Sequence, residues 1–70
     1  MRAARRAVMI EELKGMETGS RLGEIDGTAV LLEPGESPGS VRYEELFVKR
    51  DAGTIADART GRIVWPVEDE

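Results

Sequence analysis

The most constraining feature of this chain is that its 70 residues include neither cysteine nor histidine. A domain this small buries only about 60% of the surface that its unfolded chain exposes, so its core is thin. Chains of this size usually gain stability from disulfides, a structural metal or association with another chain. Without thiol and imidazole groups a disulfide framework is excluded, and the usual zinc sites cannot form. We therefore expect a single domain over residues 1–70 that associates with itself or with a partner protein.

The same two absences narrow the chemistry that the chain can perform. Serine–histidine and cysteine–histidine nucleophile pairs are excluded, and the remaining carboxylates need a cleft that holds two of them about 5–10 Å apart. The adjacent pairs Glu11–Glu12 and Glu44–Glu45 point in different directions in a helix or a strand, so we expect surface charges there. The sequence has no phosphate-binding or calcium-binding loop pattern. We therefore predict a non-catalytic protein with no cofactor and no bound metal.

The N-terminal segment has the composition of a helix. Residues 3–14 lack glycine and proline and are rich in strong helix formers, and Gly15 follows where a C-terminal cap belongs. The apolar stripe of this helix consists of Met9, Leu13 and Met16. A short strand over residues 7–11 is the competing interpretation.

Both ends of the chain are charged, with opposite sign. Arg2, Arg5 and Arg6 lie where a helix dipole disfavours cations, and no capping residue precedes them, so residues 1–6 are predicted to form a frayed basic arm. Pro66 removes a ladder donor and ends the last strand, which leaves residues 66–70 as an acidic tail.

The middle of the chain reads as short strands separated by turns. Asp26-Gly27 between the apolar runs 22–25 and 28–32 predicts a tight hairpin, because both central residues of a type I′ turn need a positive φ. The run 28–32 is apolar at nearly every position and is predicted to be a central strand covered on both faces. Residues 33–40 have the proline, glycine and serine content of a loop.

The next run, residues 41–50, is ambiguous. Its second half favours a strand from about Glu45, whereas the spacing of its aromatic and leucine side chains suits a helical turn over residues 41–47. We expect the strand, with a bulge or turn at the paired glutamates.

The connectors 51–53 and 59–61 each end in glycine and predict three-residue hairpins closed by a left-handed glycine. Asp57 is expected to accept backbone donors near its turn. Pairing about these turns would place Leu46, Val48, Ile55, Ile63 and Trp65 on one face of the sheet, and Phe47, Ala56, Ala58 and Val64 on the other.

Taken together, these elements predict an α+β fold in which an N-terminal helix is followed by a four- to five-stranded antiparallel β-meander. The sheet is either open or curled into a small SH3-like barrel. Apolar side chains on both faces of so small a sheet favour a function in protein–protein binding, as a homo-oligomer or as an accessory subunit of a larger complex. The candidate contact residues are Trp65, Phe47, Tyr43 and Val64, of which Trp65 has the alternative role of filling the core.

A nucleic-acid-associated regulator is the alternative function. Arg2, Arg5 and Arg6 would supply its phosphate contacts, but a net charge of −4 disfavours nucleic acid as a partner. The apolar run 7–10 is too short for a signal peptide or a membrane span. We therefore expect a cytoplasmic protein without membrane contact, with an organelle-targeting presequence as the alternative reading of the arginine-rich start.

Overall fold

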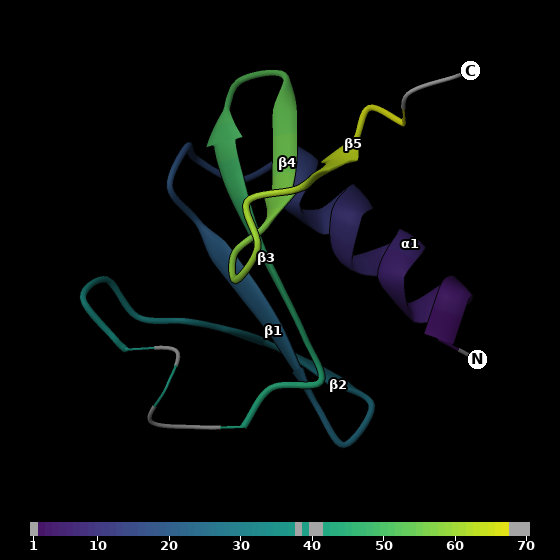
Figure 1. The fold of residues 1–70 in the computed structure, drawn as a ribbon, viewed down its shortest axis with the longest axis vertical. Coiled ribbons are helices and arrows are strands. Elements are labelled where there is room, and N and C mark those ends of the chain that lie inside the picture. The colour runs from purple at the N-terminus through teal and green to yellow at the C-terminus, as the bar shows by residue number, and fades with distance from the viewer. Residues whose placement is uncertain (1, 38, 40–41, 68–70) are drawn as a thin grey trace.

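One helix precedes a five-stranded antiparallel sheet in the computed structural model, which describes residues 2–37, 39 and 42–67, with side chains from Arg6 onward (Figure 1). The sheet is open and its strand order is β2-β1-β3-β4-β5. The predicted α+β fold class is confirmed, in its open-sheet form. The elements are α1 (Arg2–Lys14), β1 (Arg21–Ile25), β2 (Thr28–Leu31), β3 (Glu45–Asp51), β4 (Thr54–Asp57) and β5 (Ile63–Trp65).

Helix α1 lies against one face of the sheet and supplies two of the five buried residues of the main core (Figure 1). Met9 and Leu13 are fully buried and Met16 packs beside them, so the predicted stripe is confirmed. The competing strand over residues 7–11 is wrong, because these residues lie within the helix. On the sheet side the core consists of Leu22, Phe47 and Ile55. Fraying of residues 1–6 stays a prediction, since Met1 and the side chains of residues 2–5 lie outside the description.

A lysine from the sheet closes the C-terminal end of α1. The ammonium of Lys49 donates to the carbonyl oxygens of Lys14 at 2.7 Å and Met16 at 2.6 Å. Lys49 is 8% exposed, so these hydrogen bonds lie largely out of water. The last carbonyls of a helix have no partner within it, and a cation is favoured there by the helix dipole. Lys49 thereby fixes the end of the helix onto strand β3.

The β1–β2 hairpin forms as predicted. Ile25 pairs with Thr28, and the two residues between them have positive φ, 52° at Asp26 and 80° at Gly27. The predicted position of the second strand is wrong, however. β2 is an edge strand, on which Val30 is 38% exposed and Leu31 is 58% exposed. Of the two strands of this hairpin, β1 is the one with neighbours on both sides.

The long connection from β2 to β3 explains this order. Both strands run antiparallel to β1, so they are parallel to each other on its two sides. A parallel connection needs about a dozen residues because it crosses the face of the sheet. Residues 32–44 make that crossing on the face opposite α1, and a second cluster of buried side chains holds them there. The predicted loop over 33–40 lies within this segment, with residues 38 and 40 outside the description.

Gly23 of β1 makes room for the crossing segment. The aromatic ring of Tyr43 lies over it, and a Cβ at this position would be 2.2 Å from Tyr43 Cδ1. The Tyr43 hydroxyl donates to Glu36 Oε2 at 2.9 Å, while Glu36 Oε1 accepts the backbone N–H of Glu33 at 2.9 Å. The ring and these two hydrogen bonds fasten the loop to the sheet.

Strand β3 begins at Glu45, which confirms the predicted strand. The alternative helical turn is excluded for residues 45–47, which lie in β3. The predicted face assignment is wrong. Phe47, Ile55 and Trp65 share the helix face, whereas Ile63 pairs with Ala56 on the other face. The reason is that the strand register shifts near residue 50 and again between residues 55 and 56, and each shift reverses the faces beyond it.

The two C-terminal turns differ from each other. Gly61 has a φ of 81°, as predicted, but the prediction for Gly53 is wrong, because its φ is not positive. Asp51 pairs directly with Thr54 across a two-residue turn. In the longer connection from β4 to β5, Asp57 Oδ1 accepts the backbone N–H groups of Arg59 at 2.8 Å and Thr60 at 3.1 Å. The predicted role of Asp57 is thus confirmed.

Candidate functional site

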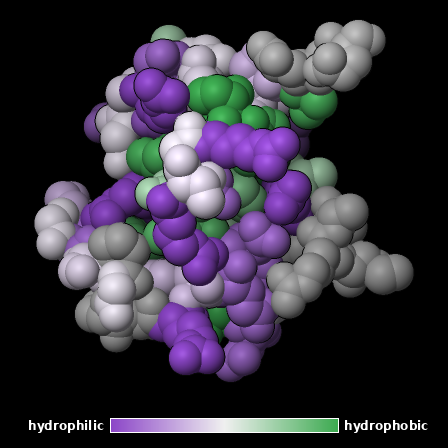
Figure 2. Space-filling view, viewed as in Figure 1, coloured by the Kyte–Doolittle hydropathy of each residue, from purple (hydrophilic) through white to green (hydrophobic). Residues whose placement is uncertain are grey.

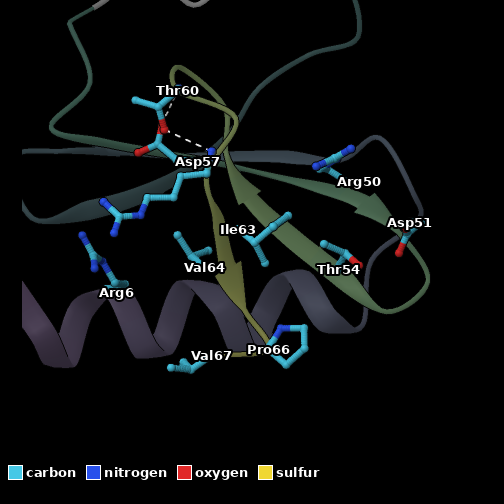
Figure 3. A pocket seen from close by; sticks show the side chains of 11 residues that line it. Arg6, Arg50, Asp51, Thr54, Asp57, Thr60, Ile63, Val64, Pro66 and Val67 are labelled. Atoms are coloured by element: carbon cyan, nitrogen blue, oxygen red, sulfur yellow. Dashed lines mark hydrogen bonds between the residues drawn. The ribbon is translucent and has the colours of Figure 1, made fainter. Parts of the chain in front are cut away.

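An open hollow runs along the outer edge of β5 (Figure 3). Ile63 and Val64 of this strand lie between Arg6, which comes from α1, and Arg50, which comes from the β3–β4 hairpin (Figure 3). Pro66 and Val67 continue the apolar wall, and Arg62 adds a third guanidinium. The hollow therefore combines an apolar floor with cationic sides.

Two carboxylates also line the hollow, and both hold a turn together. Asp57 accepts the two backbone donors described above. Asp51 accepts the backbone N–H of Gly53 at 3.0 Å; this hydrogen bond, followed by one with the Thr54 side chain, lowers the pKa of Asp51. The lowered pKa keeps the Asp51 carboxylate ionised, so that it serves as an acceptor within its turn.

The three guanidinium groups are engaged to different degrees. Arg6 lies 3.5 Å from Glu45 Oε1 and 5.7 Å from the centroid of the Phe47 ring. Arg50 and Arg62 make no hydrogen bond or ion pair with their side chains in the part of the chain that is described. These two groups are available for an anionic ligand.

The predicted contact residues do not gather on one surface. Phe47 is fully buried and Tyr43 is 6% exposed, so a partner of the folded chain does not reach either of them. Trp65 is half-buried at the margin of the core, where the Lys14 ammonium lies 4.4 Å from its ring centroid. The centre of the core is instead occupied by Phe47. Val64 is half-buried and lines the hollow.

Of the predicted phosphate contacts, Arg6 lines the hollow. The side chains of Arg2 and Arg5 lie outside the description. The hollow therefore brings together one residue from each predicted set, Val64 and Arg6, with Arg50 and Arg62.

A second candidate surface is the outer edge of β2. Leu32 donates its backbone N–H to the carbonyl oxygen of Arg21 at 3.0 Å. Because the direction of backbone groups alternates along a strand, the backbone groups of Val30 and Thr28 also point toward β1. The backbone groups of Ala29 and Leu31 consequently point away from the sheet. β2 has no charged residue, no proline and no bulge, which are the usual features that keep an edge strand from pairing.

The two edges of the sheet are thus unlike each other. β5 is three residues long, Pro66 follows it at once, and Arg62 precedes it. These features limit strand pairing at that edge. Figure 2 shows that apolar surface on the viewed face is divided into small areas among hydrophilic side chains. The β2 edge, with Val30 and Leu31, is the place where an apolar strand is left uncovered.

The sequence analysis missed two buried charged residues. The burial of Lys49 could be predicted only from its position opposite the end of α1, and that position depends on the fold. Glu24 of β1 is 5% exposed, and its Oε1 has no hydrogen-bond partner among the described residues. It lies between Ala29 and Glu45 in the strand register, on the helix face.

Comparison with protein-family models, curated proteins and solved structures found no match for this chain. Within the described residues, no helix is long and apolar enough to cross a membrane. Acidic side chains in that same part of the chain form no group of three suited to a metal ion. The geometry of the chain must therefore indicate its function.

Proposed function

We propose that this protein is a non-catalytic module that binds another protein by strand addition at β2. The observation that carries the proposal is the uncovered, uncharged edge of β2, with two exposed aliphatic side chains and outward-facing backbone groups. Strand addition uses such an edge for main-chain hydrogen bonds, while alternate side chains select the partner. The partner is a second copy in a homo-oligomer, or a larger protein to which this chain is an accessory subunit. The absence of cysteine supports a cytoplasmic setting.

Hydrogen exchange on a complex isolated gently from the protein's own cells tests this proposal. Native mass spectrometry first identifies the components of the complex. The amides of Ala29 and Leu31 should exchange fast in the isolated chain and slowly in the complex. Leu31→Lys should release the partner, because a charge on an edge strand opposes pairing.

Ile63→Lys is the matched control. Ile63 is 40% exposed on the opposite edge, so this variant adds the same charge without touching β2. A complex that survives Leu31→Lys, with the amides of residues 29 and 31 still exchanging fast, would show that β2 is not the binding edge.

A second candidate function is the binding of a phosphate-bearing ligand such as single-stranded nucleic acid. The hollow supports it, because Arg6, Arg50 and Arg62 line one surface. Replacing Arg50 and Arg62 with glutamine should weaken oligonucleotide binding and reduce its dependence on salt by about two counterions. Deletion of residues 1–6 tests the N-terminal arm in the same assay. Unchanged binding curves for both variants would eliminate this function.

A further inference from the structure

We infer that the β2 edge accepts an extended segment of a different protein, with an uncharged centre of about four residues and a basic residue at each end. This inference rests on the proposed function, since it takes β2 as the docking edge. It goes further by fixing the chemistry of the partner. The length of the centre follows from β2 itself, which is four residues long.

The backbone of β2 sets the position of the incoming strand. Ala29 and Leu31 each present one N–H and one carbonyl group away from β1. An added antiparallel strand can therefore form four main-chain hydrogen bonds with these two residues. On the helix face of the sheet, the side chains of the added strand would lie beside Ala29 and Leu31. On the opposite face they would lie beside Val30. None of these residues is charged, so a charge at the centre of the partner would find no counterpart on the strand.

The two ends of the edge are acidic. At the hairpin end, Asp26 is exposed and forms no ion pair within the described residues. At the other end, Glu33 and Glu36 stand against one cation, Arg21, whose guanidinium donates to the Glu33 carbonyl oxygen at 3.0 Å. Among the described side chains, each end thus has one more carboxylate than cation.

This charge pattern argues against a second copy as the occupant. In the symmetric pairing that sets Ala29 of one copy against Leu31 of the other, Val30 lies against Val30 of the other copy. Gly27 then faces Glu33 of the other copy, which brings the Asp26 turn to the acidic end of the second strand. Because the arrangement is symmetric, the same repulsion occurs twice. Basic ends on a foreign strand convert both repulsions into attractions.

Two peptides blocked at both ends test the inference on the full chain. One is Arg-Val-Thr-Ile-Thr-Arg and its twin has glutamate in place of both arginines. Amide chemical shifts report the binding site, and the largest changes are expected at Ala29 and Leu31. We expect the basic peptide to bind at least about tenfold more tightly at low salt, with a smaller ratio at high salt.

Two variants separate the charge effect from the backbone effect. Asp26→Asn with Glu33→Gln keeps the left-handed turn, because asparagine tolerates a positive φ, and should reduce the ratio to about twofold. Ala29→Pro removes one outward N–H group and leaves the ladder to β1 intact, so both peptides should lose binding. Circular dichroism confirms that each variant is folded.

The outcomes distinguish this inference from the proposed function. Equal binding of the two peptides, or tighter binding of the acidic one, overturns the basic partner and leaves β2 as the docking edge. A concentration-dependent dimer that Leu31→Lys abolishes also overturns the basic partner and leaves β2 as the docking edge, because it identifies a second copy as the occupant. If neither peptide nor the native partner protects the amides of Ala29 and Leu31 from exchange, both this inference and the proposed function are overturned.

Discussion

Replacing Lys49 with methionine should destabilise the protein by about 2–3 kcal/mol. Two hydrogen bonds from the ammonium are lost, one to the last residue of α1 and one to Met16 just beyond it, and hydrogen bonds to a charged group contribute about 1.5–3 kcal/mol each. Methionine keeps most of the packing of the stem, and removal of a buried charge returns part of its desolvation cost. A chain of this size has a total stability of about 4–10 kcal/mol, so the variant loses a large share.

Urea denaturation followed by Trp65 fluorescence measures this loss. With an m-value near 1 kcal/mol/M, as in the smallest domains, the midpoint should fall by about 2–3 M. Arg50→Met is the matched control, because Arg50 is the exposed neighbour on the same strand and should change stability by less than about 0.5 kcal/mol. If Lys49→Met costs no more than the control, the ammonium does not hold the end of the helix.

Three further predictions follow from the loop and turn contacts. Gly23→Ala should lower the free energy of unfolding by about 2–4 kcal/mol in urea denaturation, because its Cβ overlaps the ring of Tyr43. This loss should be smaller in a Tyr43→Ala background, and a double-mutant cycle measures the difference. The backbone N–H of Glu33 and then the Tyr43 hydroxyl lower the pKa of Glu36, so the stabilisation from its charge is present above the unfolded pKa of about 4.3 and is lost as pH falls through the folded value. Glu36→Gln should therefore differ from the parent most at pH 7 and not at all near pH 2, and a difference constant with pH would contradict this cause. Asp57→Ala should cost about 1 kcal/mol in thermal unfolding by freeing two turn amides, whereas Asp57→Asn, which keeps the acceptor, should cost less.

Local signals in the sequence predicted most of the individual elements. The helix stripe, the Asp26-Gly27 turn and the role of Asp57 each depend on residues within one or two turns of chain. Such features have their physical cause close by in sequence and can be predicted from it. The faces of the C-terminal strands could not, because irregularities near residue 50 and after Ile55 reverse the alternation, and no residue type marks these positions.

The candidate site was predicted less well than the fold. The aromatic side chains expected to contact a partner were chosen by residue type, and type alone does not distinguish an exposed anchor from a core residue. Phe47 and Tyr43 fill the two sides of the sheet instead. Arg50, near the end of β3, and Arg62, in the β4–β5 connection, line the same hollow although they are separate in sequence. Their convergence follows from strand pairing and is not visible in composition.

The composition of β2 bears on the function that we propose for this strand. A run that is apolar at nearly every position suits a strand covered on both faces, and the same run suits an edge strand that another chain will cover. The length of the loop that follows distinguishes an edge strand from an interior one. Residues 32–44 are more than a hairpin needs and are enough for a connection that crosses the face of the sheet. The crossing places β1 inside and β2 outside. The residues 28–31 are therefore composed like the interior of a sheet while lying at its margin, and the partner strand that we propose would account for both facts.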